Sequence, residues 1–421
     1  MHPIKPAYMN NPRVVAVSVR VRGEVWEIRH FCRQLAGLRP HGRNVNTIDI
    51  IELAMGITAL QAQGEGLGEV GTGDYRGATT ATRFGDVQEE FAALRGACGV
   101  YDLGFRAKIS LSGGDRVRWL NGMVTNNVRD LAVRQGVYAF LLNPQGHILG
   151  DLYAYNRGES ITVDTDAGQL EKILATFDHY IIMDDVEVAN LSEKMTALGI
   201  AGPKAREVMQ KAKIDLPALQ PLQVHEIQCD CDCGCINCTI VRTDNAIESY
   251  EIWLTADHVR PLWNQLVKAG ASSTGSEAIE LQRIASGIPR YGVDIRERDL
   301  PQETEQARAL NFNKGCYVGQ EIVERIRSRG AVHRKFTGFV IDSAAQIGAG
   351  SKVVAGDKEV GEVTSAASLP GGTKTVALGY IRREVGVPGR EVTIGSVKAV
   401  VAQLPVSENV AEENALARHS A

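Results

Sequence analysis

The stretch NKGCYVGQEIVERIRS, residues 313–328, carries the strongest chemical signal in the chain. Two glycines bracket Cys316, and apolar residues recur at helical spacing after Gln320, which predicts a glycine-hinged loop followed by a helix. The amides of a helix N-terminus and the nearby ammonium of Lys314 both favour a thiolate, so we expect a reactive thiol at Cys316. Such a thiol can serve as a nucleophile, a redox group or a soft-metal ligand. A small buried core cysteine is an equal alternative from local context alone.

The segment GCYVGQE resembles the signature K-G-C-[FY]-x-G-Q-E of the YgfZ branch of the glycine-cleavage T-protein superfamily. Members of this branch are folate-binding proteins linked to iron–sulfur cluster assembly. Further segments, such as YAFLLNPQGHILGDLYAY and GIPRYGVDIRERDLPQE, look like superfamily blocks in family order, from about Tyr75 to Pro405. A T-protein would usually carry K-x-D-F-x-G-K-E at this loop, so the cysteine and the glutamine point to the YgfZ branch. The motif residues of this chain are Gly315, Cys316, Tyr317, Gly319, Gln320 and Glu321.

The resemblance implies a pocket for tetrahydrofolate. Asp151 matches the T-protein aspartate held near the reactive nitrogen of the folate, where a carboxylate could steady or exchange a proton. Glu251 matches the glutamate that pairs with the pterin ring, since its two oxygens suit adjacent N–H donors. Tyr138 and Asn143 match pocket-lining positions, and Arg290 is a candidate clamp for the carboxylates of the folate tail. The alternatives are surface charges at the acids and the arginine, and an ordinary core residue at the tyrosine.

The sequence also departs from the T-protein pattern at three places. An arginine that T-proteins use at the substrate site falls on Ile279, and the first carboxylate of a D-D-L pair falls on Gly150. The block G-Y-T-G-E-D-G-F-E reads D-N-A-I-E-S-Y-E here and keeps little beyond Tyr250 and Glu251. These differences are compatible with folate binding and argue against aminomethyl transfer.

The order of the expected elements predicts an α+β fold. Strands and helices alternate through residues 86–212 without βαβ regularity, and six short strand candidates with glycine-bearing turns follow Arg334. The latter predict a small antiparallel barrel or sandwich, and the family resemblance implies the three-domain cloverleaf of the T-proteins. We expect an N-terminal extension at 1–54, foreign to the native domain if the protein starts near Met55. We further expect two intertwined α+β domains at 55–333, a β-barrel at 334–405 and a polar tail at 406–421.

Composition excludes several classes of protein. The chain has 46 Lys plus Arg and 50 Asp plus Glu, a formal net charge of −4, so we expect no direct nucleic-acid partner. No apolar stretch is long enough for a membrane helix, and the first residues do not resemble a signal peptide. The chain has no GxxxxGK[ST], HExxH or GxSxG motif and no strand-linked GxGxxG, which disfavours nicotinamide enzymes, nucleotide hydrolases and zinc proteases. We expect a cytoplasmic protein.

A second group of thiols stands apart from Cys316. The segment CDCDCGCINC places alternate cysteines on one face of a strand and includes one C-x-x-C pair with metal-ligand spacing. A zinc or iron–sulfur site is a weak hypothesis here, because no second pair completes a tetrahedral set. A surface hairpin with idiosyncratic thiols is the main alternative, and a local disulfide is another. The cysteines concerned are Cys229, Cys231, Cys233, Cys235 and Cys238.

The leading functional prediction is a tetrahydrofolate-binding, YgfZ-like protein that supports iron–sulfur cluster assembly or repair. Cys316, Asp151 and Lys314 are its candidate catalytic residues, with the loop thiol beside the folate pocket. The resemblance implies partners among assembly factors and iron–sulfur client enzymes, including tRNA-modifying ones, and transient binding of iron–sulfur or zinc. The alternative is a folate-dependent aminomethyltransferase or demethylase, and a third hypothesis is a non-catalytic scaffold.

Overall fold

The computed structural model describes residues 18–21, 24–27, 56–63, 67–69, 71–231, 234–245, 247–330, 332–343, 347–369 and 374–406. The chain forms two compact units, Met1–Ala54 and Met55–Ala421. In the first unit, β1 (Ser18–Val21) pairs antiparallel with β2 (Glu24–Glu27). The predicted polar tail lies almost wholly outside the described residues, as does most of the predicted N-terminal extension, and the domain boundaries stay predictions. All further elements belong to the second unit.

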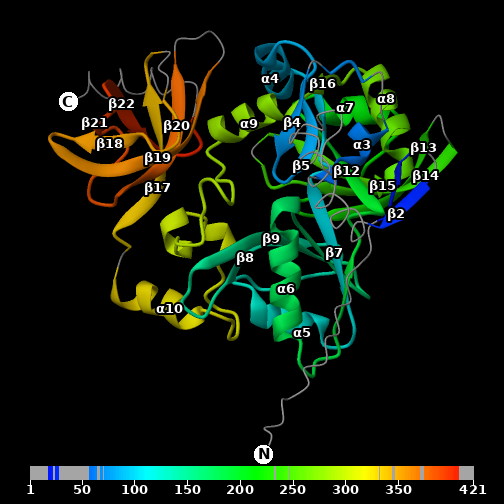
Figure 1. Ribbon diagram of the computed structural model, residues 1–421, viewed down its shortest axis with the longest axis horizontal. Coiled ribbons are helices and arrows are strands. Elements are labelled where there is room, and N and C mark those ends of the chain that lie inside the picture. Colours follow the sequence, from blue (N-terminus) through cyan, green and yellow to red (C-terminus); the bar gives the residue numbers. More distant parts are fainter. Residues whose placement is uncertain are drawn as a thin grey trace, which may run out of the picture. The chain divides into compact units, whose positions relative to one another are not determined.

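One sheet of the second unit contains five antiparallel strands in the order β11–β7–β10–β9–β8. The central strand β10 is buried along its whole length. α6 (Leu170–Tyr180) covers one face of the sheet (Figure 1) and packs Ile173 and Phe177 against Ile161 and Val163. The strands are β7 (Arg106–Ser112), β8 (Gly136–Leu142), β9 (Ile148–Asn156), β10 (Ile161–Asp166) and β11 (Glu187–Asn190).

A second, mixed sheet has six strands in the order β13–β14–β15–β12–β6–β16, of which only the pair of β16 and β6 is parallel among the described residues. A small three-stranded sheet, β3–β5–β4, completes the strands before the barrel. The bounds are β3 (Gly56–Ile57), β4 (Gly71–Tyr75), β5 (Ala78–Arg83), β6 (Gly99–Asp102), β12 (Met195–Ala201), β13 (Val224–Cys231), β14 (Gly234–Arg242), β15 (Ser249–Thr255) and β16 (Ser272–Thr274).

The described helices are short, and the amphipathic ones bury an apolar face. α8 (Val259–Lys268) packs Leu262, Trp263 and Leu266 into the core that covers the mixed sheet. Within the described residues, no helix is both long and apolar enough to cross a membrane. The remaining helices are α3 (Ala59–Ala62), α4 (Val87–Gly96), α5 (Arg116–Met123), α7 (Ala205–Lys211), α9 (Ser276–Ala285) and α10 (Gln320–Arg329), with short 3₁₀ turns η1 (Ala167–Gln169), η2 (Ala256–His258), η3 (Pro301–Thr304) and η4 (Ala307–Ala309).

The C-terminal strands close into a barrel in the order β17–β20–β19–β18–β21–β22 and form a lobe of their own, orange to red in Figure 1. Phe339, Ile381 and Val401 lie in its apolar interior. The predicted α+β class with a C-terminal antiparallel barrel is confirmed. The strands are β17 (Arg334–Ile341), β18 (Lys352–Ala355), β19 (Lys358–Ser368), β20 (Thr375–Arg382), β21 (Glu391–Ile394) and β22 (Val397–Ala402).

The turn between β8 and β9 packs against the start of α10 through two glycines with positive φ. Gly319 precedes α10 with φ +81°, and a Cβ at this position would lie 2.5 Å from the carbonyl oxygen of Asn143. Gly146, with φ +77°, faces Ile322 in the same way, since its Cβ would lie 2.8 Å from the Cβ of that isoleucine. Only glycine allows both the backbone conformation and the close approach. The GCYVGQE loop is therefore seated on the hairpin that carries Tyr138 and Asp151.

Candidate functional site

A cavity of about 180 Å³ is lined by residues of β6, β9, β15 and α9. Tyr101, Phe105 and Tyr153 provide aromatic surface, and Glu251 and Arg106 provide charged groups. A second cavity, of about 450 Å³, adjoins the first, since Asn245, Ser286 and Ile288 line both. The arrangement of flat apolar walls with a few convergent polar groups is typical of small-molecule sites.

Glu251 brings a carboxylate to the wall of this cavity from the centre of β15. The indole N–H of Trp253 donates a hydrogen bond of 2.8 Å to its Oε2 atom. Burial and the nearby carboxyl of Asp164 raise the pKa of Glu251, while Lys108 and Arg106 oppose this effect. The predicted pterin partner therefore lines the cavity with one oxygen already oriented.

Asp151 lies beside the cavity, on the same strand face as the cavity residue Tyr153. The phenol of Tyr138 donates a hydrogen bond of 2.7 Å to Oδ2 of Asp151, and the amide of Gln169 donates one of 2.8 Å to Oδ1. Burial and the carboxyl of Asp166 raise the pKa of Asp151, although both hydrogen bonds act in the opposite direction. Two predicted residues, Asp151 and Tyr138, are thus in direct contact.

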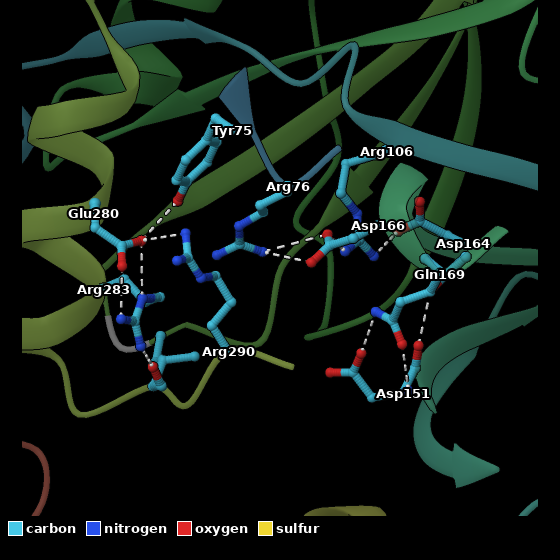
Figure 2. A network of polar contacts seen from close by, with 12 residues as sticks. Tyr75, Arg76, Arg106, Asp151, Asp164, Asp166, Gln169, Glu280, Arg283 and Arg290 are labelled. Atoms are coloured by element: carbon cyan, nitrogen blue, oxygen red, sulfur yellow. Dashed lines mark hydrogen bonds and ion pairs between the residues drawn. The ribbon is translucent and has the colours of Figure 1, made fainter. Parts of the chain in front are cut away.

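A row of alternating charges includes Arg76 and Arg106 of the cavity lining (Figure 2). Lys108 donates to Asp164 at 2.6 Å, and Arg106 bridges Asp164 at 2.7 Å and Asp166 at 2.5 Å. Arg76 reaches the far side of Asp166 at 3.3 Å. Against the effect of burial, Arg76 and Arg106 lower the pKa of Asp166. Arg106 also acts electrostatically on both Asp151 and Glu251, so this row couples the two candidate acids.

The opposite wall is tied to the barrel through Arg283 of α9. Its guanidinium contacts Glu280 at 2.7 Å (Figure 2). It also contacts Asp294 at 2.7 Å and donates to the hydroxyl of Ser365 on β19 at 2.9 Å. Against the effect of burial, Arg283 and Arg290 lower the pKa of Glu280 to about 2. Ile279 lines the cavity one helical turn before Arg283, which lines it too.

The other predicted pocket residues have local partners. The side-chain oxygen of Asn143 accepts the backbone N–H of His147 at 2.9 Å and so closes the hairpin turn. Arg290 stacks 5.5 Å from the ring centre of Tyr75 and reaches Glu280 at 3.5 Å. Neither Asn143 nor Arg290 lines the two adjoining cavities. Their assignment to folate contacts stays a prediction.

The GCYVGQE loop presents Cys316 to solvent and not to the cavity. Cys316 is exposed and is absent from the lining of both cavities, so the expected position of the thiol beside the pocket is not found. The alternative of a buried core cysteine is also wrong. Lys314 points into the protein, where its ammonium donates to the backbone carbonyls of Asn121 and Val124 and lies 4.9 Å from the ring centre of Tyr317. Among the other motif residues, Gln320 and Glu321 begin α10.

Lys314→Met is expected to change how stability depends on pH. Burial, with a smaller contribution from Arg129, lowers the pKa of Lys314 to about 7 from an ordinary value of 10.5. Between these values the unfolded state binds more protons, so the stability of the wild-type chain should rise with pH in this window relative to the variant. Urea unfolding of both proteins at several pH values measures this difference. A difference that does not vary with pH would contradict the prediction.

The cysteine-rich segment forms the hairpin of β13 and β14. Cys229 and Cys238 are buried in the core below the mixed sheet, and their thiols are hydrogen-bonded, which lowers the pKa of Cys229. Cys231 is buried as well, Cys235 is exposed, and Cys233 lies outside the described residues. No group of three or more metal-ligating side chains is found in the part of the chain that the structure describes. The weak zinc or iron–sulfur hypothesis is therefore unsupported.

The charged row was not predicted from the sequence. Lys108 and Arg106 on β7 stand directly opposite Asp164 and Asp166 on β10 in the strand register. Each strand carries its charges at alternate positions within an otherwise apolar or small-residue segment. Basic residues on one strand and acidic residues on the other could have indicated that the two strands pair. Gln169 gave no signal, because a glutamine at the start of an amphipathic helix is unremarkable in sequence.

Two known protein families match this chain. The family described as GCVT N-terminal domain matches residues 64–314, more than half of the chain, and the Glycine cleavage T-protein C-terminal barrel domain matches residues 334–407. This chain belongs to the glycine cleavage T-protein family. The superfamily predicted from GCYVGQE and its accompanying blocks is thereby confirmed, while the YgfZ branch stays a prediction.

Relatives in the T-protein family carry the name aminomethyltransferase. The protein from Rubrobacter xylanophilus is 28% identical over 340 residues, covering 80% of this chain and 88% of its own. That from Thermoanaerobacter pseudethanolicus is 24% identical over 347 residues, covering 81% and 94%. The crystal structure of glycine cleavage system aminomethyltransferase T from Bartonella henselae matches 84% of this chain and 98% of its own, with a TM-score of 0.75 and 23% identity. This likeness confirms the predicted T-protein-like fold.

Proposed function

We propose that this protein binds a tetrahydrofolate at the cavity of Glu251 and transfers a one-carbon group at its ring nitrogen, as an aminomethyltransferase-type enzyme. The observation that carries the proposal is the placement of Asp151 beside that cavity, held between Tyr138 and Gln169. The names of relatives that match about four fifths of the chain support the same class of reaction.

The lining of the cavity fits the ring system of a folate. Tyr101, Phe105 and Tyr153 offer faces for a flat heteroaromatic ring, and the carboxylate of Glu251 suits adjacent N–H donors. The first cavity, at about 180 Å³, is below the roughly 300–1,000 Å³ of common ligand sites. The adjoining cavity of about 450 Å³ provides room for the remainder of the molecule.

In this proposal each acid has a separate task. A bound tetrahydrofolate supplies the nitrogen that carries the one-carbon unit. Glu251 orients the ring, with Trp253 fixing one of its oxygens. Asp151 holds or exchanges a proton at the reacting nitrogen, and its raised pKa brings it closer to the pH at which general acid–base exchange is efficient.

Titration calorimetry with tetrahydrofolate tests the pocket. Glu251→Gln is expected to weaken binding by about tenfold or more, because a charged hydrogen-bond acceptor is lost from a buried wall. Asp151→Asn is expected to abolish formation of methylene-tetrahydrofolate from an aminomethyl donor. Glu207→Gln, an exposed site on α7, is the matched control and should behave as wild type. Unchanged affinity in both acid variants would discard this assignment of the pocket.

A YgfZ-like role in iron–sulfur cluster assembly or repair, in the cytoplasm, is the second candidate. The exposed thiol of Cys316, on a loop seated against the Asp151 hairpin, favours it. Cys316→Ala separates the two proposals. Intact methylene-tetrahydrofolate formation in this variant supports the transferase, whereas loss of iron–sulfur client activity without any such turnover in wild type supports the second candidate.

A further inference from the structure

We propose that Gln169 is a positioning residue for Asp151, whose carboxylate it orients relative to the folate cavity. The inference deepens the proposed function and rests on it. Gln169 is 4% exposed, and neither composition nor motif pointed to it. Its role follows from how its carboxamide meets Asp151 (Figure 2).

Gln169 contacts Asp151 at two points. Its Nε2 group donates to the Oδ1 atom of Asp151 at 2.8 Å, and its Oε1 atom accepts the backbone N–H of Asp151 at 3.0 Å. The carboxamide of Gln169 thus binds both the main chain and the side chain of Asp151, which restricts rotation of the aspartate about χ1 and χ2. Tyr138 holds the other carboxylate oxygen at 2.7 Å. One donor on each oxygen leaves the remaining lone pairs of the carboxylate in fixed directions.

The amide of Gln169 also holds the backbone of Asp151 on the side of β9 that faces β10. β10 pairs with β9 only as far as the partners Asp164 and Tyr153. Beyond that point β10 pairs only with β7, as far as Asp166, and η1 follows. On the side of β9, side chains replace the strand ladder. Thr165 donates its hydroxyl to the carbonyl of Asp151 at 2.9 Å, and Gln169 accepts the N–H. The backbone of Asp151 is therefore fixed by the same segment that fixes its carboxylate.

Gly150 leaves room for the clamp. A Cβ at this position would lie 3.0 Å from Oε1 of Gln169 and 3.6 Å from Ile173 of α6. A larger side chain at position 150 would compete with the carboxamide for this space. The glycine before Asp151 and the glutamine after β10 therefore form one structural unit.

The charge on Asp151 is balanced by groups from every neighbouring strand. Asp166 on β10 disfavours its ionised form, whereas Arg106 on β7, Tyr138 on β8 and Gln169 favour it. Removing the Gln169 donor leaves burial and Asp166 with less opposition. The other titratable groups that interact with Asp151 are Tyr153 and Tyr291.

The test compares Gln169→Leu and Gln169→Glu with wild type. The leucine variant loses both contacts, while the glutamate variant keeps the acceptor and sets a like charge against Asp151. ¹³C-carboxyl titration of the ligand-free full chain, with the Asp151 resonance assigned by its loss in Asp151→Asn, should show a higher apparent pKa in both variants. Gln210→Leu, an exposed site on α7, is the control and should leave that titration unchanged.

Turnover supplies a second measurement. In both variants the acidic limb of the pH–rate profile should move to higher pH, and kcat at neutral pH should fall about tenfold with little change in KM. If folded variants titrate Asp151 as wild type does, Gln169 is merely structural and the inference is overturned. Absence of tetrahydrofolate binding by wild type would refute the proposed function instead, and the carboxyl titration would then still show whether Gln169 orients Asp151.

Discussion

Arg283→Met is expected to lower the free energy of unfolding by about 3–5 kcal/mol, because it removes one partner of a buried ion pair. Asp294 is fully buried, and Arg283 contacts it at 2.7 Å. In the variant, that carboxylate would keep the hydrogen bonds from the hydroxyls of Thr364 and Ser365 but would lose its ion pair with Arg283. Methionine has a similar volume, so the loss reports the missing charge and its hydrogen bonds more than a cavity.

Urea unfolding of the full chain measures this loss. Arg118→Met is the matched control, since Arg118 is 68% exposed and its pairs with Asp115 and Asp184 lie at the surface. Such surface pairs contribute little to stability, because solvent screens them. Equal free energies of unfolding for the two variants would contradict the prediction that the buried contacts of Arg283 stabilise the chain more than a surface ion pair does.

Gly319→Ala is expected to destabilise the chain by at least about 2 kcal/mol. The backbone at Gly319 has φ +81°, which costs an alanine about 1–2 kcal/mol. In addition the new Cβ would meet the carbonyl oxygen of Asn143 at 2.5 Å, so the hairpin and the loop would have to separate. We expect this separation to disturb Asp151 as well, because β9 starts just beyond that turn.

Gly315→Ala in the same loop is the control. A Cβ at Gly315 would meet no heavy atom within 4 Å, and this glycine is not among those with positive φ. Thermal unfolding of the two variants and of wild type separates the specific contact from a general sensitivity of the loop. A Gly315 variant as unstable as the Gly319 variant would contradict the explanation by backbone contact.

The elements that sequence could predict are those with a local or family signature. The C-terminal barrel follows from short strands and glycine turns, and the hairpin that carries Tyr138 and Asp151 follows from two apolar segments joined by a glycine-bearing turn. Glu251 was found from its place in a family block and does line the cavity. In each of these, the information lies within a few residues of the side chain concerned.

What sequence could not predict depends on contacts between distant segments. Lys314 lies two positions before Cys316, yet its ammonium turns to the end of α5, a segment almost two hundred residues earlier. The clamp of Gln169 exists because the pairing of β10 with β9 stops at Tyr153, two residues before Asp151. Both outcomes follow from register and from which carbonyls lack partners, quantities that no local pattern encodes.

The contact of Gly146 with the Gly319 region also bears on the order of folding. The hairpin of β8 and β9 joins neighbouring segments and can form early, whereas the loop before α10 must close a very long stretch of chain to reach it. We therefore expect Tyr138 and Asp151 to meet in an early intermediate that still lacks the cysteine loop. Pulse-labelled hydrogen exchange during refolding should protect the amides of β8 and β9 before those of α10.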